Sequence, residues 1–175
     1  PPSVSTVLLN DYKVVYARDS VLFAASNNSV ISALFDTKSR QYRPYDFLEL
    51  PGPSVRIKRC DSVIVVQSTS GTLSFFRNDV LPYLTFLGTV NPPTDYLDFA
   101  IGGDQLYLAC GFKWVRLFTL NGYSALTPAD SSSEPVHAIA CEINQSRLFV
   151  IDDYSGVFTF RPSPAQINAS IHFLP

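Results

Sequence analysis

The sequence predicts an all-β fold built from four similar units that follow one another along the chain. An apolar, strand-like segment recurs about every 42 residues, and its copies begin near residues 19, 61, 104 and 146. Turns containing Asn, Ser or Gly follow the copies, as hairpin connections require. No segment of helical length places its apolar residues at a period of 3.6 residues. Strand-rich repeats of ~40–45 residues are typical of propeller blades, so we expect a β-propeller of about four four-stranded blades.

Each unit is expected to hold four short strands in the same order. The first strands, rich in β-branched and aromatic residues, are expected at residues 13–17, 55–58, 97–101 and 136–140. The second strands are expected at residues 19–24, 61–66, 104–109 and 146–151. The third strands are expected at residues 30–35, 72–76, 114–120 and 157–160. The fourth strands have the weakest pattern, and their candidates are residues 46–50, 84–88, 123–126 and 170–174.

The second strand of each unit is apolar at nearly every position. Such a pattern is expected where both faces of a sheet are covered. Val65 and Leu108 occupy equivalent positions in the second strands of the two interior units. Both residues are therefore predicted to be buried between sheets.

Proline-rich links at residues 51–53, 92–93 and 128–135 separate the units. Because proline cannot donate a hydrogen bond to a β-ladder, these links are expected to be loops. We therefore expect one domain or segment over residues 1–175. Its units are expected at approximately residues 11–53, 54–95, 96–135 and 136–175.

Residues 70–76 (SGTLSFF) and 155–160 (SGVFTF) each form a Gly-containing turn followed by a strand with aromatic residues. They resemble the turn and strand that end a WD-repeat, where that family places Trp followed by Asp. Here only Phe35 and Asp36 keep an acidic residue after the aromatic one, and the Gly-His pair of the family is missing. The resemblance covers essentially the whole chain as a pattern. It implies a WD-like propeller that acts as a non-catalytic scaffold, and it leaves the subfamily open.

The four units are expected to form an arc of a larger propeller. Residues 5–10 look like an additional leading strand, and the chain starts at Pro1 and contains no Met. The missing blades would then come from another segment or another chain. The end faces of such an arc would carry the apolar side chains of Val21, Phe23, Phe149 and Phe158. A closed ring of four blades is the alternative.

Composition favours a folded chain with a protein partner. Hydrophobic residues make up 46% and charged residues 16% of the chain, against the usual ~25% charged. This balance suggests that a partner covers some apolar surface. The net charge of −2 gives no global electrostatic argument for nucleic acid. No apolar run approaches the ~18–20 residues of a membrane span, so none is expected.

The residues that could carry chemistry lack the spacing of a known site. Cys60, Cys110 and Cys141 match no zinc or redox motif, and free, buried thiols are expected, with one disulfide plus a free thiol as the alternative. His137 and His172 fall inside predicted strands with no ligand-type spacing around them. The acidic residues of the turn at 152–155 lack the further oxygens of a calcium loop. We therefore expect no enzyme, no cofactor and no metal.

Six of the 13 cationic residues lie within a short stretch of the chain. They are Lys38, Arg40, Arg43, Arg56, Lys58 and Arg59. This basic cluster is interpreted as a docking patch for an acidic protein segment, or less favourably for a phosphate backbone. The alternative is an ordinary solvated stretch, split between two faces of the molecule.

Three N-glycosylation sequons begin at Asn27, Asn144 and Asn168. All three are expected in turns or at loop edges, where a glycan could be attached. They favour a secreted protein, whereas the small number of cysteines favours an intracellular one. The sequence does not decide the compartment, although the intracellular interpretation is preferred.

The function expected from these patterns is a scaffold for protein–protein interaction within a larger assembly. Its partners would be other protein subunits or the remaining blades of the same propeller. The loops at residues 51–54, 91–95 and 128–134 and the turns at 26–29, 68–71 and 152–155 are the expected contact segments. The alternative is an extracellular glycoprotein or lectin-like propeller that binds carbohydrate.

Overall fold

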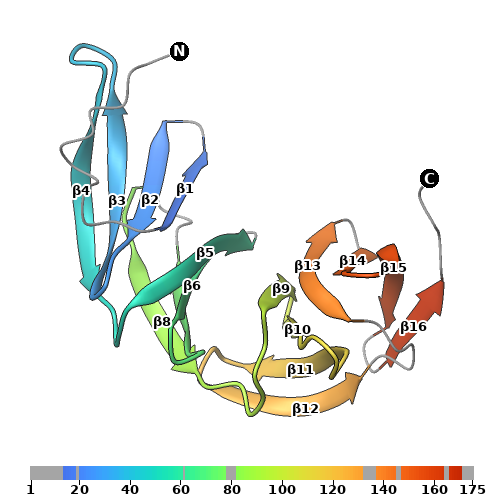
Figure 1. The fold of residues 1–175 in the computed structure, drawn as a ribbon. Helices are drawn as coiled ribbons and strands as arrows, with labels where there is room; N and C mark the ends of the chain where they lie inside the picture. Colours follow the sequence, from blue (N-terminus) through green and yellow to red (C-terminus); the bar gives the residue numbers. More distant parts are fainter. Residues whose placement is uncertain are drawn as a thin grey trace. The chain divides into compact units, whose positions relative to one another are not determined.

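The computed structural model describes residues 14–18, 20–60, 62–77, 82–131, 137–144, 147–163 and 166–170. These residues form sixteen β-strands in four antiparallel sheets of four strands each (Figure 1). Within each sheet the strands follow one another in chain order. The described residues contain no helix, and hence none that could span a membrane. The prediction of an all-β chain with four four-stranded units is confirmed.

The strands have the following bounds. Sheet 1 holds β1 (Val14–Arg18), β2 (Val21–Ala25), β3 (Ser29–Asp36) and β4 (Gln41–Glu49). Sheet 2 holds β5 (Ser54–Cys60), β6 (Val63–Ser68), β7 (Leu73–Arg77) and β8 (Thr85–Val90). Sheet 3 holds β9 (Asp98–Gly102), β10 (Gln105–Ala109), β11 (Val115–Asn121) and β12 (Ala125–Ser131). Sheet 4 holds β13 (Ala138–Asn144), β14 (Arg147–Asp152), β15 (Gly156–Ser163) and β16 (Gln166–Ser170).

The chain divides into two compact units at residues 91 and 92. The first unit contains sheets 1 and 2, and the second unit contains sheets 3 and 4. In the first unit β5 packs beside β1 and β2, and in the second unit β13 packs beside β9 and β10. In both units, therefore, the first strand of the second sheet lies against the first two strands of the sheet before it.

In sheet 1, both faces of β2 and of the first part of β3 are buried. Val21, Phe23 and Val30 belong to a cluster with Ile64 and Phe76 of sheet 2. The residues that alternate with them on β2 and β3 form a second buried cluster, which comprises Leu22, Ala24, Ile31 and Ala33. Because side chains alternate between the two faces of a strand, a strand covered on both sides must be apolar throughout.

The expectation that Val21 and Phe23 lie on an exposed end face is wrong. Both are buried in the cluster between sheets 1 and 2. Phe149 is only half-buried, and Phe158 is half-buried against the core of the second unit. Sequence alone placed these residues on β2, β14 and β15, but did not determine which face of each strand meets the neighbouring sheet.

The core of the second unit joins sheets 3 and 4. Tyr107 and Leu117 of sheet 3 cluster with Leu148, Val150 and Phe160 of sheet 4. Burial raises the pKa of the Tyr107 phenol to about 12, with a smaller contribution from the Asp104 carboxylate. This ring is therefore a neutral part of the core, with its hydroxyl donating a hydrogen bond to Gln105.

Two outer strands are longer than the sequence predicts, and both continue through a proline. β4 begins at Gln41 rather than at residue 46 and includes Pro44. β12 runs from Ala125 to Ser131 through Pro128, where a loop was expected. Each is the last strand of its sheet, so the missing N–H of proline does not interrupt the ladder. The expected loop at residues 128–134 is therefore partly a strand.

One expectation near the C-terminal end is wrong, and others fall on residues that the structure does not describe. β16 occupies Gln166–Ser170, so the sequon residue Asn168 lies in a strand rather than in a turn. The leading strand expected at residues 5–10, His172, and the rest of the strand expected at 170–174 lie outside the described residues.

Val65 and Leu108 are fully buried, as predicted from their equivalent positions. Val65→Asp is expected to lower the free energy of unfolding by about 3 kcal/mol or more, because it places an unpaired charge in an apolar environment. Val55 offers a matched control, since it is 47% exposed on the neighbouring strand β5. Val55→Asp should cost less than about 1 kcal/mol. Denaturant unfolding monitored by circular dichroism distinguishes the two variants, and equal losses would contradict the assigned faces.

Candidate functional site

The exposed apolar side chains of the second unit gather at one end of sheets 3 and 4. Among its described residues, the large exposed apolar side chains are Leu97, Phe112, Trp114, Ile151 and Tyr154. They lie in or next to the β10–β11 turn, the β14–β15 turn and the segment before β9. We call this set, together with His137 and Asp153, the aromatic end.

A backbone bridge joins the two sheets at this end. The Gly111 N–H donates to the Ala138 carbonyl at 2.8 Å, and the Ala138 N–H donates back at 3.2 Å. Gly111 has a φ of +60°, a conformation that glycine adopts without steric cost. Trp114 also has a positive φ, of +66°, which is uncommon for a bulky residue. Backbone strain of this kind is concentrated at binding and catalytic sites in other proteins, which makes the turn a candidate site.

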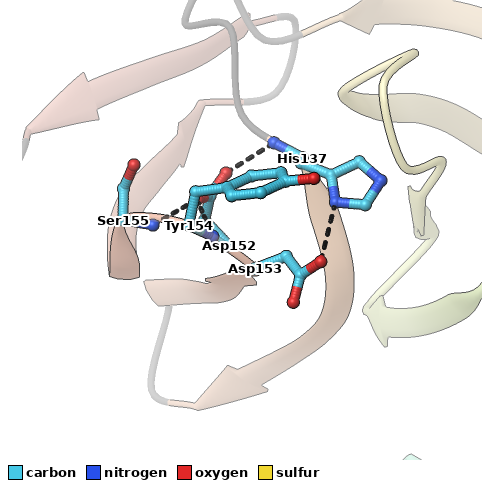
Figure 2. A network of polar contacts seen from close by, with 5 residues as sticks. All are labelled: His137, Asp152, Asp153, Tyr154 and Ser155. Carbon is cyan, nitrogen blue, oxygen red and sulfur yellow. Dashed lines mark hydrogen bonds and ion pairs between the residues drawn. The ribbon is translucent and has the colours of Figure 1, made fainter.

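His137 lies between two aromatic rings. Its imidazole centroid is 3.8 Å from that of Phe112 and 5.5 Å from that of Tyr154. Its Nδ1 atom is 3.5 Å from Oδ2 of Asp153, which is too long for a strong hydrogen bond (Figure 2). Phe112 and Tyr154 are each 75% exposed, so the outer parts of both rings meet solvent.

Asp152 fixes the turn that carries Tyr154. Its buried carboxylate accepts hydrogen bonds from the backbone N–H of His137, of Tyr154 at 2.8 Å and of Ser155 at 2.6 Å (Figure 2). Burial acts to raise the pKa of this carboxyl, but the donors to it outweigh burial and hold the pKa below the ordinary value. The carboxylate therefore stabilises the turn from inside, in agreement with a polar hairpin turn. It has little hydrogen-bonding capacity left for a ligand.

The groups at the aromatic end suit recognition by stacking and charge. Two open ring faces, one exposed carboxylate and one imidazole can contact planar, apolar or cationic groups. The described residues contain no group of three or more His, Cys, Asp and Glu side chains that could hold a metal ion. Burial raises the pKa of the nearby Cys110 thiol to about 11, so this thiol is protonated at neutral pH. Cys60, Cys110 and Cys141 form no disulfide, and the last two are buried as expected.

The equivalent turns of the first unit have a different chemistry. At the β2–β3 turn the hydroxyls of Ser26 and Ser29 lie 2.7 Å apart. At the β6–β7 turn the hydroxyls of Ser68 and Ser70 lie 2.8 Å apart. The aromatic end therefore belongs to the second unit and is not a general property of the repeat.

The sequence indicated only part of this site. The turn at 152–155 was expected to contact a partner, but the turn at 110–114 was not. Its signal was present, since Phe112 and Trp114 replace the small polar residues found at the matching turns. The contact between this turn and His137 depends on the packing of two sheets, which the sequence pattern does not show.

The six residues of the basic cluster occupy two separate strand systems of the first unit. Lys38 and Arg40 are exposed in the β3–β4 turn, and Arg43 follows on β4. Arg56, Lys58 and Arg59 lie on β5, are half-buried and have interactions of their own. β5 makes its main contacts in sheet 1 with β1 and β2, at the edge opposite β4. The cluster is thus close together in sequence but divided between the outer edge of sheet 1 and the first strand of sheet 2.

Two of the three sequon residues have described side chains. Asn27 is exposed in the β2–β3 turn, and Asn144 is exposed as the last residue of β13. Both positions are accessible to modification.

No protein-family model matches the chain, and no curated protein matches it in sequence. Similar solved structures include two computationally designed proteins. The designed Ika4 protein is 10% identical over 91% of this chain and 97% of its own, with a TM-score of 0.59. The designed Ika8 protein is 11% identical over 89% of this chain, with a TM-score of 0.58, and this chain spans 47% of its length. Identities this low show a shared fold and nothing of function.

Asp152→Ala is expected to lower the free energy of unfolding by about 2–4 kcal/mol. It removes the acceptor for three backbone N–H groups, each of which would be left without its partner. Asp152→Asn keeps one acceptor oxygen and should cost less. The exposed neighbour provides the control, since Asp153→Ala should change stability by less than about 0.5 kcal/mol. Chemical denaturation of the three variants tests this order, and equal losses at Asp152 and Asp153 would contradict the bracing role.

The contribution of Asp152 should also depend on pH. Its pKa is lower in the folded state than the ordinary value of 3.8. The folded state therefore binds this proton less tightly than the unfolded state, and the stabilisation is complete above the unfolded pKa. As the pH falls through the folded pKa, the stabilisation is lost. The stability difference between the unmodified chain and Asp152→Asn should be constant near neutral pH and shrink in acid. A difference that stays constant across the acid range would show that the pKa is not shifted.

Proposed function

We propose that this chain is a WD-repeat-like β-propeller segment that acts as a non-catalytic scaffold for protein–protein interaction. The meander order of all four sheets supports this proposal, because consecutive four-stranded antiparallel sheets are the building blocks of propellers. The sequence period of about 42 residues agrees with it. In this proposal the packed sheets are the rigid support and their turns present the contact residues.

The observation that carries the proposal is the one-sided gathering of exposed apolar side chains at the aromatic end. Protein interfaces are enriched in aromatic residues, and their binding energy is concentrated in a few such anchors. At the opposite end of sheet 3, the described turns contain Gly103, Asp104, Gly122, Tyr123 and Ser124, of which Tyr123 is half-buried. No large apolar side chain of these described turns is exposed, which suits one binding end and one solvated end.

The turns of the aromatic end are braced before any partner arrives. The Asp152 carboxylate holds one turn, and the Gly111–Ala138 backbone bridge holds the other. A preorganised surface loses less conformational entropy on binding than a mobile one. Phe112 and Tyr154 are the expected anchors, because they combine the highest exposure with fixed backbones.

A second candidate function is carbohydrate binding by an extracellular glycoprotein. The flat faces of Phe112 and Tyr154 can stack on a sugar ring. The Asp153 carboxylate beside them can accept hydrogen bonds from the sugar hydroxyls. The exposed sequon residue Asn27 agrees with an extracellular location. The protein-interaction function is preferred because the aromatic end also contains the aliphatic side chains Leu97 and Ile151, which contribute apolar area without a flat stacking face.

The double variant Phe112→Ser/Tyr154→Ser should remove the partner contact. Each lost anchor costs about 2 kcal/mol in typical interfaces, so affinity should fall by well over tenfold. Quantitative affinity capture compares the double variant with the unmodified chain. The matched control is Phe47→Ser/Phe86→Ser, which removes two half-exposed aromatic rings from the first unit.

Partners that are lost with the double variant and retained with the control would support the protein-interaction function. A glycan array probed with the same three chains tests carbohydrate binding. This function requires a sugar signal that the unmodified chain and the control give and that Phe112→Ser/Tyr154→Ser loses. Unchanged protein and glycan binding by the double variant would refute both functions for the aromatic end. Thermal melts of each variant establish that it is folded.

A further inference from the structure

The β3–β4 hairpin of the first unit combines a charged turn with a shallow hollow. The hollow has a volume of about 400 Å³. Its lining residues are Leu34, Phe35, Asp36, Arg43, Pro44 and Tyr45. Most of this lining is apolar, and the charged groups lie at the side nearest the turn.

A β-bulge places Tyr45 at the hollow. Ser32 pairs with Asp46 and Ala33 pairs with Pro44, so Tyr45 has no opposite residue on β3. A bulge of this kind re-aims the side chain of the extra residue. The Tyr45 hydroxyl lies 3.0 Å from that of Tyr83, and the two rings meet edge to face at 5.2 Å. The Tyr45 ring is thus held by the bulge at its backbone and by Tyr83 at its hydroxyl, while it remains about half exposed.

The bulge recurs in the repeat, but the aromatic residue at it does not. In sheet 2 the extra residue opposite β7 is Leu87, and in sheet 3 the extra residue opposite β11 is Ala129. Among the described residues, sheet 1 alone combines a bulge with a large aromatic ring beside a cationic turn. This combination therefore needs an explanation other than the geometry of the fold.

The half of the hairpin nearest the turn carries an excess of positive charge. Residues 34–45 contain three cations, Lys38, Arg40 and Arg43, and one carboxylate, Asp36. The Asp36 carboxylate accepts the N–H of Lys38 at 2.9 Å and pairs with Nη2 of Arg43 at 2.8 Å. Its charge is thus engaged by the turn and by Arg43. Lys38 and Arg40 are exposed, so their positive charges face solvent.

Two further carboxylates, Asp46 and Glu49, lie on the part of β4 away from the turn. One carboxylate oxygen of Asp46 accepts the N–H of Phe47, and the other accepts the N–H of Leu84 at 2.7 Å. Asp46 is therefore held against the segment that precedes β8.

We propose that this hairpin surface binds an acidic segment of another protein. An apolar side chain of that segment would fill the hollow against Leu34, Phe35 and Tyr45, and its carboxylates would face Lys38 and Arg40. β4 is the outermost strand of sheet 1, and no described strand pairs with its outer edge. An extended segment can therefore lie along it, with Pro44 limiting the backbone pairing to either side.

Nucleic acid fits this surface less well than an acidic protein segment. Binding to a phosphate backbone depends on many cationic contacts, whereas this hairpin has three cations, one of which is already paired. The apolar lining of the hollow also requires a side chain rather than a phosphate. The surface lies in the first unit and does not depend on the aromatic end, so each can fail its test alone.

The test uses a short fluorescein-labelled peptide of Glu residues around one central Phe, with binding measured by fluorescence anisotropy at low salt. Lys38→Glu/Arg40→Glu is expected to weaken binding by about tenfold or more, because it replaces two attractive charges with two repulsive ones. Tyr45→Ser should weaken binding of this peptide but not of a version with Ser in place of Phe. Arg147→Glu, an exposed charge reversal in the second unit, is the matched control and should leave affinity unchanged.

The expected pattern also includes loss of affinity with added salt, since exposed charges are screened. The proposal is overturned if the unmodified chain does not bind the Glu peptide, or binds it no better than a Gln version. Equal affinity of the Lys38→Glu/Arg40→Glu variant overturns it as well. Tighter binding of a short single-stranded DNA than of the Glu peptide would assign the surface to nucleic acid instead. Circular dichroism confirms that each variant is folded.

Discussion

The structure depends on burying both faces of the second strands of sheets 1, 2 and 3, whereas β14 of sheet 4 alternates between buried and more exposed positions. A single antiparallel sheet with one apolar face can leave its other face in water, but the second strands here are apolar on both sides. On β2, Phe23 packs toward sheet 2 while Leu22 and Ala24 are buried on the other face. Each buried Phe or Leu side chain stabilises the fold by roughly 1.5–3 kcal/mol relative to an exposed one. Strands that are apolar on both sides need a covering layer on each face, which agrees with a chain built from repeated sheets.

This constraint leaves the strand ends and outer strands free to vary. The central strands must keep apolar side chains on both faces, whereas a turn must only reverse the direction of the chain. The β2–β3 turn does so with serine hydroxyls, and the β10–β11 turn does so with Gly111 beside Phe112. Outer strands tolerate Pro44 and Pro128 because no described strand pairs with their outer edges. Binding chemistry can therefore change at these positions without changing the core.

The fold could largely be predicted from sequence, while the candidate sites could not. The period located all four sheets, and the apolar second strands correctly placed Val65 and Leu108 in the interior. Outer strands were underestimated, because a proline that breaks a central ladder is harmless at an edge. The candidate sites could not be predicted for a different reason. The contact of His137 with Phe112 joins residues of two sheets, and the basic cluster is divided because β4 belongs to sheet 1 and β5 to sheet 2.

Apolar burial stabilises the stacked sheets, but it is non-directional and cannot by itself fix how one sheet is placed on the next. Directional polar contacts within each unit supply that information. In the second unit the buried Asp98 carboxylate of β9 accepts the Cys141 N–H of β13 at 3.0 Å. In the first unit the Ser54 N–H of β5 donates to the Ser26 carbonyl at 3.2 Å. A shift between sheets would leave these buried groups unpaired, at a cost of about 1–3 kcal/mol each. The Asp98–Cys141 link is adjacent to Leu97, so it also positions the aromatic end, whereas the Ser54–Ser26 link lies at the β2–β3 end of sheet 1, opposite the β3–β4 turn.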